Sequence, residues 1–195
     1  MLVGGFNQSS LNVALPDVAI ALHATAGQMN WVLLGYLLAN SGLMIVFGRL
    51  ADMFSRRRMW AFGIALFTIA SFAVGFSQHP WQAIVLRTIS GVGAAMMWST
   101  SGALLTAWVP RRMLGQAMGI YYASSSVAQL LGPVLGGVIA DSLGWRWLFW
   151  VNGPIGLAGS WAGFALLRKE AKPTVREHFD VIGALAGVLF LGAIV

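Results

Sequence analysis

Arg87 is the one charged side chain that lies well inside a long apolar stretch of this sequence. Burying a charge among apolar residues is costly, so an ionisable residue in such a place marks a functional site by default. Arginine does not release its proton in proteins, so Arg87 could stabilise an acid but could not carry protons itself. The acids lie near the ends of the apolar stretches or between them, and they are Asp17, Asp52, Asp141, Glu170, Glu177 and Asp180.

Other chemistry has little support in the sequence. Cysteine is absent, and His23, His79 and His178 lie at the ends of apolar stretches or in loops, with no pairing at metal-ligand spacing. No phosphate-binding loop or nucleophile elbow is present. We therefore expect no catalytic residue, no metal site and no cofactor, and we do not expect an enzyme.

The composition is that of an integral membrane protein. Of the 195 residues, 58% are hydrophobic and 9% are charged, which is too little charge to cover the surface of a soluble domain. The lipid bilayer is the natural solvent for such a surface. The net charge of +6 is explained by the positions of the basic residues, so it does not indicate a nucleic-acid partner.

Six stretches are long enough to cross a bilayer, since a membrane helix needs about 20 mostly apolar residues. They are Leu2–Leu22, Asn30–Phe47, Met59–Ser77, Trp81–Val109, Leu114–Ala140 and Trp147–Leu167. Short connections make consecutive helices antiparallel neighbours. We expect an all-α, six-helix transmembrane bundle over residues 1–167, a cytoplasmic loop over 168–179 and the truncated start of a seventh transmembrane helix over 180–195.

The basic residues predict the orientation of these helices. Ten of the twelve follow the second, fourth and sixth stretches: Arg49, Arg56, Arg57, Arg58, Arg111, Arg112, Arg168, Lys169, Lys172 and Arg176. Positive charge stays on the cytoplasmic side of a membrane. The sequence therefore predicts a multi-pass protein of the cell membrane, plasma or inner, with these three loops in the cytoplasm.

The segment 48–58 reads Gly-Arg-Leu-Ala-Asp-Met-Phe-Ser-Arg-Arg-Arg. Gly48 permits a tight exit from the second helix, and nearby arginines or the start of the next helix would stabilise the carboxylate of Asp52. The plain interpretation is a basic cytoplasmic loop. The segment also resembles the signature between helices two and three of the major facilitator superfamily, Gly-x-Leu-Ala-Asp-x-x-Gly-Arg-Arg. That resemblance implies a conformational role for Asp52, Arg56 and Arg57, with the acid bracing the two halves of a transporter.

Two further segments resemble motifs of the same superfamily. The segment 87–93 resembles the helix-four motif Arg-x-x-x-Gly-x-Gly, which implies a role for Arg87 in proton coupling; the alternative is that Arg87 snorkels to the outer interface. The segment 128–137 resembles the helix-five motif of the antiporter branch and contains Gly132, Pro133, Gly136 and Gly137. Its small residues recur every four positions, which also predicts a helix-packing face.

Segments 12–16, 145–156 and 178–183 look like the corresponding parts of the fourteen-helix drug:proton antiporters, a branch of this superfamily. That branch commonly has an acid in helix one, five residues before the position of Asn12. Here that position is Asn7. We therefore expect the proton-carrying acid to come from sequence outside this chain.

The resemblance implies that the six helices form two inverted three-helix repeats and export small amphipathic molecules or drugs by alternating access, with protons as the coupling ion. The remainder of the transporter chain is expected as a partner, because the path lies between two such bundles. The alternatives are a dedicated metabolite transporter of the superfamily and a truncated bundle that does not transport. Polar and aromatic candidates for the substrate path are Asn7, Gln8, Asn12, Tyr36, Asn40, Tyr122 and Gln129.

The orientation can be tested with single cysteines, because this segment contains no thiol of its own. Arg57→Cys, Arg112→Cys and Lys172→Cys should resist an impermeant thiol reagent in intact cells, whereas His79→Cys should react, since positive loops stay in the cytoplasm. Labelling of Arg57→Cys from outside would show that the chain is inserted the other way round.

Overall fold

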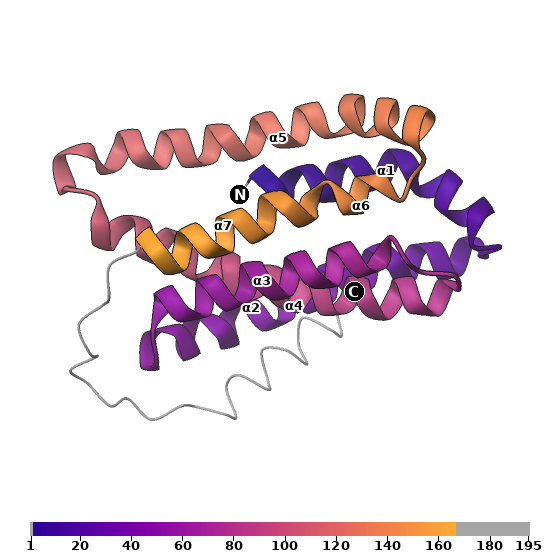
Figure 1. Cartoon of the computed structure of the whole chain (residues 1–195). Helices are drawn as coiled ribbons and strands as arrows, with labels where there is room; N and C mark the ends of the chain where they lie inside the picture. The colour runs from indigo at the N-terminus through magenta and orange to yellow at the C-terminus, as the bar shows by residue number, and fades with distance from the viewer. Residues whose placement is uncertain (1, 167–195) are drawn as a thin grey trace.

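The computed structural model describes residues 2–166, and every element in that range is helical. The helices are α1 (Leu2–Ala21), α2 (Ala26–Met53), α3 (Arg56–Val74), α4 (Pro80–Trp108), the 3₁₀ turn η1 (Arg111–Met113), α5 (Leu114–Leu143), α6 (Trp147–Trp150) and α7 (Asn152–Leu166). Figure 1 shows α6 and α7 on one line, and the Val151 amide donates to the Trp147 carbonyl at 3.0 Å between them. They form the sixth span, so the predicted all-α six-helix bundle is confirmed. The segments 168–179 and 180–195 lie outside the described residues.

Three described segments are long and apolar enough to cross a membrane: Ala26–Met53, Arg56–Val74 and Arg111–Leu143. The long helices α1 and α4 are absent from this set, and they carry the polar side chains Asn7 and Arg87. These two helices bury their polar groups against neighbouring helices, as described below.

The turn between α2 and α3 differs from the sequence-based expectation. Gly48 does not end the helix: α2 continues to Met53, and the Phe54 amide still donates to the Leu50 carbonyl at 3.0 Å. The turn is reduced to Phe54 and Ser55. Ser55 caps α3 with an extended backbone, φ −173°, and its hydroxyl accepts a hydrogen bond from the Arg58 amide at 3.3 Å. Because any residue adopts this conformation, the turn does not need the glycine that the superfamily signature has at position 55.

Close helix pairs are built on small residues. A Cβ added at Gly136 of α5 would lie 2.5 Å from the Ser10 Cβ of α1, and one added at Gly91 of α4 would lie 2.5 Å from the Tyr36 carbonyl oxygen of α2. A Cβ at Gly156 of α7 would collide with Thr68 of α3. Such contacts let helix backbones approach closely.

Three of the helix pairs follow the pattern of an internal repeat. The well-packed pairs include α1 with α5, α2 with α4 and α3 with α7. If the first three spans are matched to the last three, α1 corresponds to α4, α2 to α5 and α3 to α7. The α1–α5 pair then corresponds to the α4–α2 pair, and the α3–α7 pair corresponds to itself. These three pairs fit two three-helix repeats. The α3–α4 pair does not: it is closely packed, whereas its counterpart, α7 with α1, has little contact. Figure 1 shows α5 running beside α1 at one side of the bundle.

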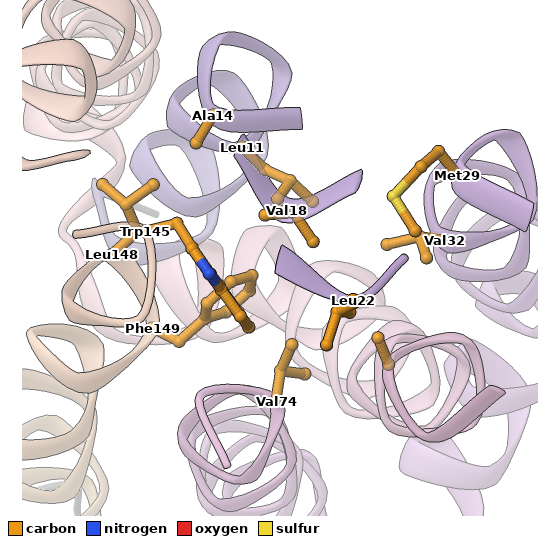
Figure 2. Packing of buried hydrophobic residues seen from close by; sticks show 11 residues of the cluster. Leu11, Ala14, Val18, Leu22, Met29, Val32, Val74, Trp145, Leu148 and Phe149 are labelled. Atoms are coloured by element: carbon orange, nitrogen blue, oxygen red, sulfur yellow. The ribbon is translucent and has the colours of Figure 1, made fainter. Parts of the chain in front are cut away.

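An apolar cluster closes one end of the bundle. Figure 2 shows its side chains, which come from α1, α2, α3, α4 and the α5–α6 junction: Leu11, Ala14, Val18, Leu22, Met29, Val32, Val74, Ala83, Trp145, Leu148 and Phe149. This is the end opposite the arginine-rich turns at Arg56 and Arg111. Dry packing therefore joins the helices at the end that is predicted to face outward.

Gly136→Ala should destabilise the protein, because the nearest atoms to the new methyl group are the Cβ and backbone of Ser10, which cannot rotate away. We expect a loss of about 1–3 kcal/mol from overpacking, measured as a lower thermal unfolding midpoint of the purified protein. Gly119→Ala on the same helix is the matched control, since no atom lies within 4 Å of its added Cβ. Equal midpoints for the two variants would contradict the close α1–α5 contact.

Candidate functional site

The Arg87 side chain is fully buried between three helices. Its Nη1 donates a hydrogen bond to Asn7 Oδ1 of α1 at 2.5 Å, and its guanidinium carbon lies 4.4 Å from the centre of the Tyr36 ring of α2. The head of the side chain thus points into the bundle and away from the membrane surface. The structure does not have the alternative arrangement, in which Arg87 snorkels past Trp81 to the outer interface.

Two glycines near Arg87 explain how α4 packs closely enough to place the Arg87 side chain between the helices. Gly91, one turn further along α4, admits the Tyr36 backbone, whereas a Cβ at Gly93 would lie 2.5 Å from the Phe67 amide of α3. The two glycines of the Arg-x-x-x-Gly-x-Gly pattern therefore seat α4 against two different helices. The Ser90 hydroxyl donates to the Arg87 carbonyl at 2.7 Å, so this polar group is satisfied within α4.

The partners found for the Arg87 head are electrically neutral. Asn7 supplies an amide oxygen and Tyr36 supplies the π-face of its ring, which attracts a desolvated cation by roughly 2 kcal/mol or more. The Nε and Nη2 atoms of Arg87 are buried and have no hydrogen-bond partner among the described residues. The acids of the described part of the chain, Asp17, Asp52 and Asp141, are exposed to solvent or lipid. The cluster of Asn7, Tyr36 and Arg87 therefore holds a positive charge that no described carboxylate neutralises.

The other candidates for the substrate path do not gather at this cluster. Gln8 and Asn40 are partly buried, and Asn40 Oδ1 has no hydrogen-bond partner among the described residues. Asn12, Tyr122 and Gln129 are exposed on α1 and α5. Of the seven candidates, the structure brings together Asn7 and Tyr36, and it does so around Arg87.

The small face of α5 packs on the first half of α1. Gly132 and Gly136 are buried against Ser9 and Ser10, Gly137 lies near Val13, and Pro133 is exposed on the other side of the helix. Ser9 and Ser10, which form the surface that receives α5, are not among the residues predicted from the sequence. Gly5 and Ser9, four residues apart, were the available signal, because small residues at this spacing form one face of a helix.

Asp52 lies in the last turn of α2 and pairs with the first residue of α3. Arg56 Nε donates to Asp52 Oδ1 at 2.9 Å, and Arg56 Nη2 lies 2.8 Å from the same oxygen. The two side chains are 53% and 37% exposed, so solvent screens the pair and its contribution to stability is small. Arg57, the next residue, is partly buried at the start of α3.

The sequence is similar to transporters over nearly its whole length. The family model described as Major Facilitator Superfamily matches residues 1–194. The tetracenomycin C resistance and export protein of Streptomyces glaucescens is 32% identical over 180 residues, which are 91% of this chain and 34% of that protein. The methylenomycin A resistance protein of Bacillus subtilis is 32% identical over 192 residues, which are 98% of this chain and 41% of that protein. The chain thus spans about a third to two fifths of these relatives.

The fold is also that of a solved transporter. A bacterial homologue of the human lysosomal transporter Spinster, in an inward-facing and occupied conformation, superposes with a TM-score of 0.76 at 16% identity, over 88% of this chain and 43% of that one. At this identity the likeness shows the fold alone. The resistance and export proteins confirm the resemblance to the drug-efflux branch, and the match over residues 1–194 establishes that the chain belongs to the Major Facilitator Superfamily.

Proposed function

We propose that the full-length protein exports small amphipathic molecules or drugs from the cell by alternating access, coupled to protons, and that it works in the plasma or inner membrane. The observation that carries this proposal is the similarity of 91–98% of the chain to proteins named for antibiotic resistance and export. The described bundle would form one wall of the path, and the rest of the protein would form the other.

The Arg87 cluster supports a role in coupling. Proton carriage needs a group that titrates, and an arginine meets this need only by stabilising a nearby acid. The acids of the described residues are exposed near helix ends, so the coupling acid would come from the remainder of the protein. Arg87 would hold that acid in its ionised form until substrate or a conformational change displaces it.

A second candidate is export or import of one dedicated metabolite. It is favoured by the riboflavin transporter of Clostridioides difficile, which is 32% identical over 177 residues, or 91% of this chain. Both candidates use the same bundle and differ in the breadth of substrates. Efflux assays with several unrelated dyes and with riboflavin in the same vesicles would separate them, because a drug exporter moves several dyes and a dedicated transporter moves one compound.

Arg87→Ala tests the coupled mechanism. In vesicles that contain the full-length protein, substrate-driven proton movement should fall at least about tenfold, the size of effect expected when a buried charged hydrogen bond is lost, while substrate binding is retained. Arg112→Ala, at an exposed arginine of η1, is the control and should keep full coupling. Intact coupling in Arg87→Ala would remove Arg87 from the mechanism.

Asp52→Asn tests the conformational role of the α2–α3 turn. The change keeps the size of the side chain and removes the charge that Arg56 contacts. Because an exposed ion pair contributes about 0–1 kcal/mol, folding and membrane insertion should be unchanged, whereas the export rate should fall several-fold if Asp52 braces one conformation. Asp141→Asn, at an exposed acid of α5, is the control. Normal export by Asp52→Asn at normal expression would remove Asp52 from the site.

A further inference from the structure

The apolar cluster of Figure 2 lies next to the Arg87 site, in the same three helices. Each helix that supplies a residue of the site also supplies a cluster residue one turn nearer the predicted outer end. These pairs are Asn7 and Leu11 of α1, Tyr36 and Val32 of α2, and Arg87 and Ala83 of α4. Because residues four apart lie on one face of a helix, an apolar layer is stacked on the charged one.

The cluster is thick and almost free of polar atoms. Along α1 it extends from Leu11 to Leu22, which is about 16 Å at the helical rise per residue. Its members are at most 6% exposed, and the indole nitrogen of Trp145 is the only side-chain nitrogen or oxygen among them. At the outer end, the guanidinium carbon of Arg146 lies 4.6 Å from the centre of the Trp145 ring. Since water leaves apolar constrictions, the cluster separates Arg87 from the polar groups of the outer end.

Toward the cytoplasmic end the same helices carry polar groups. Asn40 lies one turn beyond Tyr36 in α2, and its Oδ1 is buried without a hydrogen-bond partner among the described residues. The fully buried Ser90 lies close behind Arg87 in α4. Buried polar groups that lack partners in the protein are the groups that ordered water satisfies. The two sides of the Arg87 site therefore differ: water finds hydrogen-bond partners on the cytoplasmic side and an apolar layer on the outer side.

We propose that the apolar cluster is the barrier that keeps protons on the outer side of the membrane from reaching the Arg87 site through the bundle. The proposal rests on the proposed proton coupling, because alternating access requires that the two sides never reach one site together. A chain of water across the cluster would conduct protons or hydroxide without any substrate. Leu11 and Val32 form the layer next to the site, so they have a role in coupling besides packing.

Leu11→Asn places a polar amide of nearly the same size in this layer. Proteoliposomes that hold the full-length variant should lose an imposed pH gradient roughly fivefold faster than those with the unmodified protein, which is the effect of one added hydrogen bond to water. No substrate is present, an enclosed dye reports pH, and valinomycin with potassium holds the membrane potential at zero. Ile20→Asn is the matched control on the same helix and should not raise the leak, since Ile20 is 75% exposed and lies outside the cluster.

Leu11→Ala distinguishes a barrier to water from ordinary packing. The variant loses packing contacts and should unfold at a lower temperature. The cavity that it leaves is lined by apolar side chains, and such cavities stay dry. We therefore expect Leu11→Ala to be less stable than the unmodified protein and to leak no faster. If Leu11→Ala leaks as fast as Leu11→Asn, lost packing explains the leak and the proposal is wrong.

Val32→Thr takes the place of Leu11→Asn if that variant fails to fold, because threonine has nearly the shape of valine and adds a hydroxyl to the same layer. Val85→Thr, at a 47% exposed position of α4, is its control. A leak no faster than that of the unmodified protein, in whichever of the two polar variants folds, would overturn the proposal. A raised leak in a protein that fails every transport assay would contradict the proposed function and leave the barrier standing.

Discussion

A positive charge held inside the bundle is the constraint on which the arrangement of α1, α2 and α4 depends. A guanidinium buried among apolar side chains is tolerated only where polar groups reach it. Here these groups come from two other helices: the amide of Asn7 and the ring of Tyr36. Both must lie within a few ångströms of one side chain, so the charge fixes the rotation of α1 and α2 relative to α4.

The small residues make that proximity possible. Gly91 lets α2 approach α4 beside Arg87, and Gly136 lets α5 approach α1. In a membrane the hydrophobic effect does not drive helices together, so close packing and interhelical hydrogen bonds must do so. The glycine contacts and the Arg87–Asn7 hydrogen bond therefore act together: the first bring the backbones close, and the second selects which side chains meet.

The sequence was sufficient for features that depend on composition along the chain and insufficient for those that depend on how helices are rotated. The number of spans follows from the lengths of the apolar stretches, the packing face of α5 from four-residue spacing, and the position of Arg87 inside a span from the sequence itself. The partner of Arg87 could not be identified from the sequence, because it depends on the relative rotation of α1 and α4. For the same reason Tyr122 and Gln129 could be named as polar residues of α5 but not recognised as exposed ones. The sequence predicted that α2 would end near Gly48, whereas α2 continues to Met53. The prediction failed because a glycine permits a turn but does not require one.

The residue type at position 7 determines whether the charge of Arg87 is neutralised by α1. An acid at this position would form a closed ion pair with Arg87, and breaking such a buried pair leaves a charge uncompensated. Asn7 keeps the hydrogen bond and the position of the guanidinium but leaves the charge unneutralised. The same amide that anchors Arg87 therefore leaves the guanidinium charge without a carboxylate beside it among the described residues.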